Sequence, residues 1–140
     1  MTTIAFDGET LAADSREFNS ESGIYVDNCT KITRWKNVYF ASAGSSSAGL
    51  LFERWFKDQT KEKPSLNSDF ETFVVRNGKC FYYDDNYISS EQKPPYAIGS
   101  GGALAMAAMY AGCDAKKAVQ IAMKLDPYTG GKVKTMKVKP

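Results

Sequence analysis

Apolar and polar positions divide the first third of the chain into short strands. Two apolar runs, residues 4–6 and 11–13, flank Asp7-Gly8, a sequence typical of a β-hairpin turn. Further short strands are expected at residues 23–26, 29–35 and 38–43, and in the second of these apolar residues alternate with polar ones. This pattern predicts antiparallel strands joined by short turns.

Helical spacing first appears in AGLLFERWF, which follows a run of three serines. Its apolar residues Leu51, Phe52, Trp55 and Phe56 fall on one side of a helix, and a serine is available as the N-cap. The charged segment 58–69 that follows is expected to be a connector rather than a link between domains.

Strands resume at FETFVVR and KCFYY, which flank Asn77-Gly78, a second hairpin signal. A polar loop with Pro94-Pro95 then leads to the short strand YAI. The final KVKTMKVKP alternates lysine with Val or Met, and it predicts an edge strand because charged side chains discourage pairing with another chain.

Two more helices are expected between the YAI strand and the lysine-rich strand. The first begins after GSGG (99–102) and ends at Gly112, and its buried face is expected to consist of Leu104, Ala107, Ala108 and Ala111. Asp114 is expected to cap the second helix, AKKAVQIAMKL, which ends at DPYTGG. The buried side of this helix is expected to consist of Ala115, Val119 and Ala122.

The order of the elements lacks the regular strand–helix alternation of a Rossmann fold. It predicts an α+β fold in which two antiparallel sheets pack face to face, with helices outside. The chain has the length of one domain, expected to span residues 1–140, and its 43% of apolar residues can build one core.

The composition argues against several classes of function. The 18 basic and 16 acidic residues nearly cancel, so neither nucleic acid nor a membrane surface is an expected partner. The absence of histidine removes Ser-His-Asp and Cys-His mechanisms and most catalytic zinc sites. Cys29, Cys80 and Cys113 are odd in number and far apart, which favours reduced, buried thiols in a soluble, cytoplasmic protein.

Three polar features are weak signals when each is taken alone. GSGG is typical of a tight turn with Ser100 as an N-cap, and DPYTGG is typical of a helix end. Lys31 has the position of a solvent-facing lysine within a strand. Function therefore depends on how these features lie relative to one another.

The first hairpin brings an acid toward the start of the chain. A two-residue loop would pair Thr2 with Ala13, and a three-residue loop would pair Thr2 with Asp14. Only the second register puts the Thr2 and Asp14 side chains on one face, and the sequence does not choose between the two.

An N-terminal threonine allows one reaction that needs no histidine. Once Met1 is removed, Thr2 carries both a hydroxyl and a free α-amino group with an ordinary pKa of about 8, and the amine can accept the hydroxyl proton. A nearby lysine would lower the pKa of this amine, and an aspartate would hold the lysine in place. A backbone N–H would then bind the developing oxyanion.

The chain resembles the proteasome β-subunit family of N-terminal-nucleophile hydrolases, and especially the bacterial HslV-type peptidase. TTIA…LAADSR matches the start of the family, so Thr2 is the matching nucleophile and Asp14 the supporting acid. TKITRW is similar to the family's lysine-containing strand, which makes Lys31 the matching lysine. YFASAG resembles the strand with the oxyanion N–H, where Ala41 stands in place of the usual glycine.

Two later motifs complete the resemblance. YAIGSGG closely resembles the corresponding motif of the family, and DPYTGG resembles the family's Asp-x-x-Ser-Gly segment. By this match Ser100 lies near the threonine amine, while Asp126 and Thr129 support it.

The resemblance implies a four-layer αββα sandwich, the Ntn-hydrolase fold, and a threonine-type peptidase that needs neither a metal nor an organic cofactor. It also implies peptide or unfolded-protein substrates, a homo-oligomer with enclosed sites, and an ATPase unfoldase as a candidate partner. The chain departs from the family by having one expected helix, instead of two, between Gly44 and Phe70. That helix layer takes part in ring assembly in the family.

Two alternatives stay open at this point. One is an amidohydrolase of small amides, which would use the same Thr2 chemistry on the same fold. The other is a catalytically inactive, proteasome-like assembly or binding protein, which the shortened helix layer and Ala41 favour.

Overall fold

The structure, a computed structural model, describes residues 2–66 and 69–139. Its helices are α1 (Ser46–Lys57), α2 (Gly102–Tyr110) and α3 (Ala115–Leu125). Its strands are β1 (Ile4–Phe6), β2 (Thr10–Ala13), β3 (Glu17–Phe18), β4 (Tyr25–Val26), β5 (Ile32–Trp35), β6 (Val38–Ala43), β7 (Glu71–Arg76), β8 (Lys79–Asp84), β9 (Ser89–Gln92), β10 (Tyr96–Ile98) and β11 (Lys134–Lys137).

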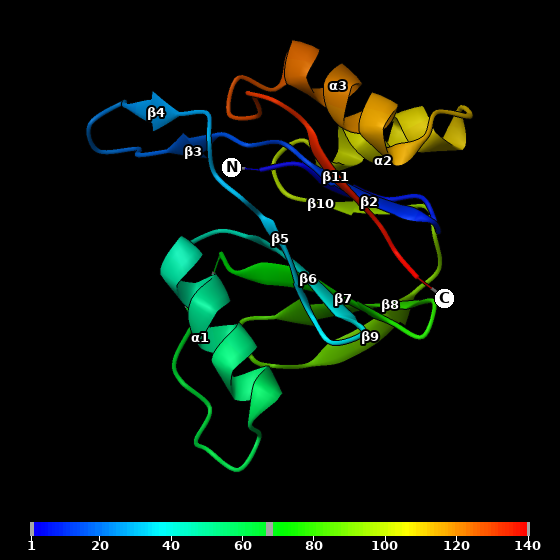
Figure 1. Ribbon diagram of the computed structural model, residues 1–140. Helices are drawn as coiled ribbons and strands as arrows, with labels where there is room; N and C mark the ends of the chain where they lie inside the picture. Colours follow the sequence, from blue (N-terminus) through cyan, green and yellow to red (C-terminus); the bar gives the residue numbers. More distant parts are fainter. Residues whose placement is uncertain (1, 67–68, 140) are drawn as a thin grey trace.

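The elements form four layers (Figure 1). One sheet has the strand order β10-β1-β2-β11, and the facing sheet has the order β5-β6-β7-β8-β9. Helices α2 and α3 cover the outer face of the first sheet, and α1 covers the outer face of the second. All pairs in both sheets are antiparallel. The expected α+β sandwich of two antiparallel sheets flanked by helices is confirmed.

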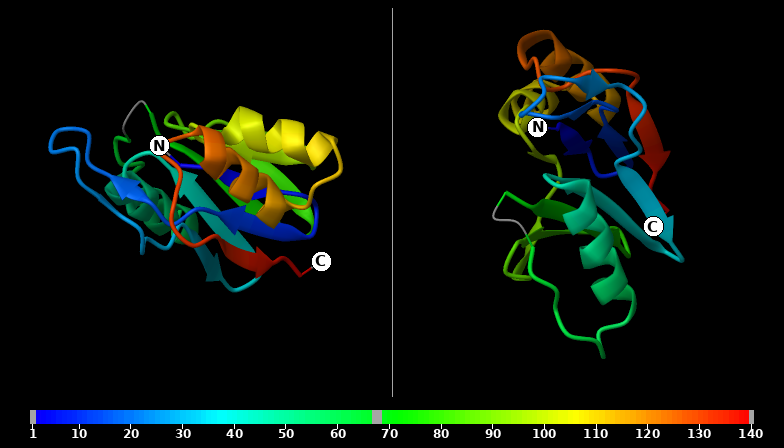
Figure 2. Two further views of the ribbon diagram at one scale, coloured as in Figure 1. Left: turned by 90° about the horizontal axis from the view of Figure 1, so that it is seen from above. Right: turned by 90° about the vertical axis from the view of Figure 1, so that its left-hand side faces the viewer.

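A small two-stranded ribbon, β3–β4, extends from one end of the sandwich (Figure 2). Its apolar residues Ile24, Tyr25 and Val26 are exposed. The ribbon is tied to the body by the edge-to-face contact of Phe18 with Tyr128, whose ring centroids lie 5.3 Å apart.

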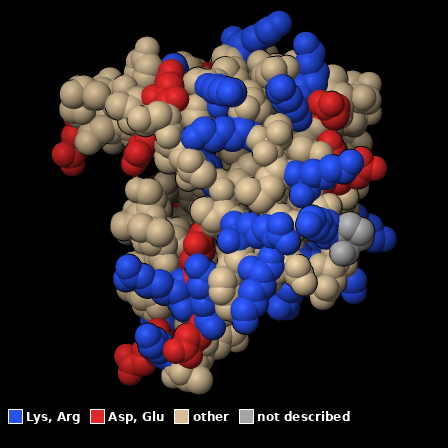
Figure 3. Space-filling view, in the orientation of Figure 1, with Lys and Arg blue, Asp and Glu red and all other residues tan. Residues whose placement is uncertain are grey.

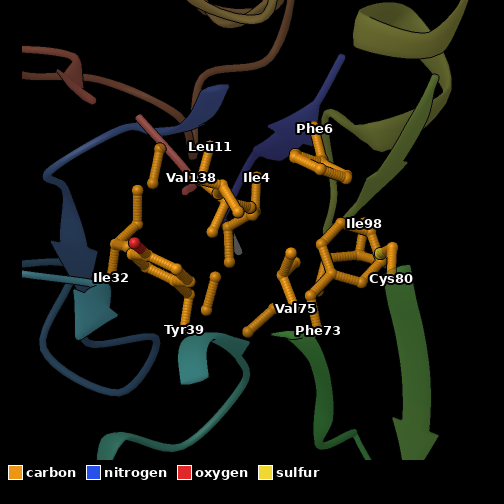
Figure 4. Packing of buried hydrophobic residues seen from close by; sticks show 13 residues of the cluster. Ile4, Phe6, Leu11, Ile32, Tyr39, Phe73, Val75, Cys80, Ile98 and Val138 are labelled. Atoms are coloured by element: carbon orange, nitrogen blue, oxygen red, sulfur yellow. The ribbon is translucent and has the colours of Figure 1, made fainter. Parts of the chain in front are cut away.

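The core between the two sheets is made by the alternation of side chains along each strand. Ile4 and Phe6 of β1 point into this core, together with Tyr39 of β6 and Phe73 of β7 (Figure 4). The intervening Ala5 points to the opposite face, toward α2 and α3. Burial of large apolar side chains on one face therefore holds the two sheets together.

Two of the sequence-based turn and cap assignments are confirmed. Arg76 pairs with Lys79, so Asn77-Gly78 forms a two-residue hairpin loop, and both loop residues have positive φ as a type I′ turn requires. The side chain of Asp114 accepts a hydrogen bond from the N–H of Lys117 and so caps α3.

The first hairpin has neither of the expected registers. Phe6 pairs with Leu11, so the loop has four residues. The Asp7 carboxylate closes this larger loop by accepting hydrogen bonds of 2.9 Å from two main-chain N–H groups within it. As a result Thr3, not Thr2, lies opposite Asp14, and the Asp14 N–H donates to the Thr3 carbonyl.

The expected buried face of α2 is correct at Ala108 but wrong at its other three positions. Leu104 is half-buried and Ala107 and Ala111 are exposed, whereas the buried residues are Gly102, Ala105, Ala108 and Met109. Apolar residues surround this helix on all sides, so periodicity could not choose a face. The fully buried α3 residues Ala115, Val119 and Ala122 are as expected.

Three strands or boundaries differ from the sequence-based prediction. β9 forms in the segment that was expected to be a polar loop, and β3 forms where no strand was expected. Lys31 immediately precedes β5 instead of lying within it.

β11 pairs with β2 alone in its sheet, so the expected lysine-rich edge strand is confirmed. None of the described helices has the length and apolarity needed to cross a membrane.

Candidate active site

Three residues from separate segments meet at the start of the chain. The Lys31 ammonium group donates hydrogen bonds to the Thr2 hydroxyl, at 3.0 Å, and to Asp14 Oδ1, at 2.8 Å. The Lys31 side chain is 6% exposed, and that of Asp14 is fully buried. A buried ion pair thus holds a cation directly against the hydroxyl oxygen of Thr2.

Asp14 is a structural anchor for this arrangement. Besides Lys31, its carboxylate accepts hydrogen bonds from the N–H of Thr3 at 3.1 Å, of Arg16 at 3.3 Å and of Gly130 at 3.1 Å. One side chain therefore fixes β1, the segment after β2 and the loop after α3. These donors offset the cost of burying the carboxylate charge.

The main-chain nitrogen of Thr2 has its own polar contact on the side of α2. Its N–H donates to Ser100 Oγ at 3.1 Å, and the Ser100 hydroxyl lies 2.6 Å from Asp126 Oδ2. The Ser100 proton is given to the carboxylate, since the alternative acceptor, the Thr2 carbonyl, is 3.4 Å away. Ser100 is therefore not the N-cap of α2, where Gly101 stands without a side-chain cap.

A second hydroxyl chain reaches the same carboxylate. Thr129 donates to Asp126 Oδ2 at 2.6 Å, and Thr3 Oγ1 lies 2.7 Å from Thr129 Oγ1. Since the single Thr129 proton is used on Asp126, Thr3 must be the donor in the second contact. Thr3 was not singled out from the sequence, although it follows Thr2 directly.

Asp126 collects these hydrogen bonds at the C-terminal end of α3. Burial alone would raise the pKa of its carboxyl group, but hydrogen bonds from Ser100 and Thr129 and from the main-chain N–H of Tyr128 outweigh burial and lower it. Asp126 is therefore ionised at neutral pH and acts as an acceptor only.

The glycines of GSGG are required by close approach of the chain. Gly99 has a φ of +94°, and a Cβ there would clash with the Thr2 carbonyl oxygen. A Cβ on Gly101 would clash with the hydroxyl of Thr3 and lie 3.3 Å from Asp126 Oδ2. The absence of side chains is what lets Ser100 reach the start of the chain.

A cavity of about 520 Å³ opens beside Thr2. It lies between the β3–β4 ribbon and α1, where Figure 3 shows the surface hollowed. Its lining residues are Thr2, Arg16, Glu17, Phe18, Ser20, Cys29, Thr30, Lys31, Thr33, Ser42, Gly44, Ser45, Ser46, Gly49, Leu50, Glu53 and Asp69. The Thr2 hydroxyl is thus next to a space that can receive a ligand.

Ala41, the expected oxyanion donor, is not at this cavity. It is fully buried within β6, paired with Ile32 on one side and Phe73 on the other. Gly44, which follows the end of β6, lines the cavity together with Thr2. The remaining matched residues gather around the Thr2 main chain and hydroxyl as described above.

Comparisons with known proteins place the fold. No protein-family model and no curated protein matches the sequence. Among solved structures, HslV from Trypanosoma brucei matches with a TM-score of 0.75 and 21% identity, over 99% of both chains. BPH from Thiobacillus denitrificans matches with a TM-score of 0.73 and 22% identity, over 99% of this chain and 98% of that one. The chain has an HslV-type, proteasome-like fold.

A second BPH structure, solved in complex with epoxomicin, matches over 99% of both chains with a TM-score of 0.70 and 22% identity. Within residues 2–66 and 69–139 of this HslV-type fold, no group of three or more His, Cys, Asp and Glu side chains is placed to hold a metal ion. The cluster around Thr2 consists instead of hydroxyls, carboxylates and one ammonium group.

Proposed function

We propose that the chain is a threonine-type peptidase in which Thr2, exposed by removal of Met1, is the nucleophile. The observation that carries the proposal is the Lys31 ammonium group, held by Asp14 at 2.8 Å and by the Thr2 hydroxyl at 3.0 Å. A cation at this position favours the alkoxide form of Thr2. Met1 lies outside the described residues, so its removal is part of the proposal.

In the proposed reaction the α-amine of Thr2 takes the hydroxyl proton, directly or through a water molecule, and Oγ1 forms a bond to the substrate carbonyl carbon. The resulting tetrahedral oxyanion collapses, the C–N bond breaks, and the ammonium group returns its proton to the leaving amine. Water then hydrolyses the ester on Thr2 by the same route. The Lys31 charge disfavours a second cation beside it, which favours the neutral form of the Thr2 amine, the form that can accept a proton.

Ser100, Asp126 and Thr129 are proposed to orient the amine. The Thr2 nitrogen donates to Ser100 Oγ at 3.1 Å, and Ser100 is fixed by its 2.6 Å hydrogen bond to Asp126. An amine that donates one proton to Ser100 has its lone pair directed elsewhere, so this contact selects the orientation in which it can act as a base.

For the oxyanion we propose the main-chain N–H of Gly44 in place of Ala41. Ala41 is fully buried within the sheet, whereas Gly44, like Thr2, lines the cavity. Gly44 has a φ of +98°, and a Cβ there would lie 2.9 Å from the Asp69 carbonyl oxygen, so no other residue fits well. A main-chain donor needs no particular side chain.

The substrate would be a peptide or an unfolded protein. A homo-oligomer that encloses the sites, with an ATPase unfoldase as partner, is part of the same proposal and rests on the likeness of fold to HslV and BPH. Over the described part of residues 58–69, neither a helix nor a strand follows α1. An oligomer of this chain would therefore have to pack around α1 without a second helix beside it.

The proposal is tested by intact-mass spectrometry before and after treatment with a peptide epoxyketone, which reacts with a hydroxyl and an amine on one residue. We expect the purified chain to lack Met1 and to gain one inhibitor mass. Thr2→Ala should abolish labelling and lower hydrolysis by at least about 10³-fold. The matched variant Thr2→Ser keeps both groups and should still be labelled.

Met1 retained on every molecule, with no labelling, would contradict the proposal and favour a non-catalytic assembly or binding protein. Hydrolysis of small acyl amides, without cleavage of casein or of short fluorogenic peptides, would identify an amidohydrolase instead. Undiminished activity of Thr2→Ala would remove Thr2 as the nucleophile.

A further inference from the structure

The cavity beside Thr2 has a charge pattern that the proposed reaction does not use. When Thr2 Oγ1 attacks a substrate carbonyl, the side chain attached next to that carbonyl must enter the nearest open space, which is this cavity. The residues on its walls therefore decide which side chain is accepted. This reasoning rests on the proposed function.

Carboxylates outnumber the available cations on these walls. Three acids, Glu17, Glu53 and Asp69, line the cavity. Two cations also line it, Arg16 and Lys31, but each is paired with an acid outside the lining.

The pairing of the two cations is tight. The Arg16 guanidinium makes a bidentate contact with Asp27, with distances of 2.8 and 3.0 Å, and also donates to the Pro127 carbonyl. The Lys31 ammonium group is 2.8 Å from Asp14. Both positive charges are thus compensated locally, and the excess charge facing the cavity is negative.

Glu53 is the best placed of the three acids. It projects from α1 and is only 16% exposed. Its Oε1 accepts a 2.6 Å hydrogen bond from the hydroxyl of Thr33 in β5, and this bond fixes the Glu53 side chain. Its other oxygen is 3.9 Å from Lys57, a long contact with a side chain that is 40% exposed and so weakly bound.

Glu17 adds negative charge from the opposite wall. It belongs to β3, and its Oε1 accepts a 3.4 Å hydrogen bond from Ser46 at the start of α1. Among the described residues Glu17 forms no ion pair. Lys and Arg side chains gather instead on the neighbouring face of the molecule, around β5 and β11 (Figure 3).

We propose that this cavity selects a lysine or arginine side chain on the residue whose carbonyl Thr2 attacks, and that Glu53 is the main specificity-determining residue. A cationic side chain entering the cavity gains a charge-assisted contact with a partly buried, pre-positioned carboxylate. An acidic side chain meets like charges and is rejected.

The test compares fluorogenic peptides that differ only at the residue before the cleaved bond: arginine, norleucine or glutamate. We expect kcat/KM to be on the order of tenfold or more higher for arginine than for norleucine, with glutamate the poorest. Glu53→Gln, which keeps the size and can still accept from Thr33, should reduce the arginine-to-norleucine ratio by about tenfold. The exposed Glu91→Gln is the matched control and should leave the ratio unchanged.

A binding measurement separates this proposal from the proposed function. On Thr2→Ala, which cannot form an acyl-enzyme, benzamidine should bind measurably more tightly than neutral benzamide, and Glu53→Gln in that background should remove the difference. If the epoxyketone fails to label Thr2 but benzamidine shows this pattern, the peptidase proposal falls and the cation preference stands. Equal kcat/KM for arginine and norleucine, or equal binding of the two benzene derivatives, would overturn the preference.

Discussion

The two outer helical layers of the molecule are built in opposite ways. Between the β10-β1-β2-β11 sheet and helices α2 and α3, seven of the nine buried residues of the cluster are alanine: Ala5, Ala12, Ala97, Ala105, Ala108, Ala115 and Ala118. Between the other sheet and α1 the contacts are aromatic, with Phe52 at the centre of rings from Trp55, Phe56, Phe70, Tyr83 and Tyr87.

Each of the two layers also contributes a different part of the candidate site. The alanine layer holds Ser100 and Asp126, whose 2.6 Å hydrogen bond depends on backbones that approach closely. The aromatic layer supplies a cavity wall through Gly49, Leu50 and Glu53 of α1. Close packing of small residues thus positions the polar groups around Thr2, while larger side chains hold one wall of the cavity.

The largest expected effect on stability is in the aromatic layer. Phe52 is fully buried, and Phe52→Ala should lower the free energy of unfolding by about 3–5 kcal/mol. Turnover at saturating substrate should change little in the folded variant, because Phe52 touches none of the groups around Thr2, whereas KM should rise. Denaturant unfolding and steady-state kinetics measure the two effects. Phe52→Leu should cost less than half as much, and an equal cost would mean that the ring contacts, and not the apolar volume that leucine retains, account for the whole loss.

The next effect is in the alanine layer and should be mainly catalytic. Gly101→Ala places a Cβ against the Thr3 hydroxyl and 3.2 Å from Ala122 Cβ. We expect a loss of about 1–3 kcal/mol in stability from overpacking. The displaced Thr3–Thr129–Asp126 chain should lower kcat by more than about tenfold. If kcat were unchanged while stability fell, the small-residue contacts would not be positioning the site.

The third expected effect is smaller and concerns the pH dependence of stability at the residues that end α3 and α1. Asp126 has a lowered pKa in the folded chain, so its charge stabilises the fold above its unfolded pKa, and this contribution is lost as the pH falls through the lowered folded pKa. The difference in unfolding free energy between the wild type and Asp126→Asn should be about 1–2 kcal/mol at neutral pH and should vanish between about pH 5 and pH 2.

Asp58, which ends α1, is the control for this prediction. The side-chain hydrogen bond from Thr60 also lowers the pKa of Asp58, but this carboxylate is exposed to solvent. Asp58→Asn should therefore show a much smaller pH-dependent difference than Asp126→Asn. Equal pH dependence of the two variants would show that the buried hydroxyl chain around Asp126 adds nothing.

The layers could be anticipated from the sequence because turn signals and alternation act locally. The Asn77-Gly78 hairpin follows from two residues that tolerate positive φ. The Asp7-Gly8 loop did not follow, because the Asp7 carboxylate also accepts a hydrogen bond from the N–H of Ala115, a contact distant in sequence. The face of α2 is set by its neighbours, since the helix is apolar on all sides.

The candidate site was anticipated through resemblance more than through local physics. Hydrogen bonds among residues up to 126 positions apart, such as that of Thr3 with Thr129, have no signature in the spacing of the chain. Ala41 was chosen on a motif, but its main chain pairs with the strands on both sides of β6. The sequence does not mark where β6 ends, and Gly44, which follows that end, lines the cavity.

The smallest expected effect is at Gly49 and tests the same difference between the two layers within α1. Gly49 lies inside α1, and a Cβ there would meet Ser42 at 3.4 Å, an ordinary contact, in place of the clash expected at Gly101. Since alanine favours helix over glycine, Gly49→Ala should raise the free energy of unfolding by about 0.5–1 kcal/mol, measured by urea denaturation. Because Gly49 lines the cavity, KM for bulky substrates should rise slightly while kcat stays constant. A loss of stability as large as that of Gly101→Ala would mean that α1 is packed as closely as α2, and the distinction between the two layers would fail.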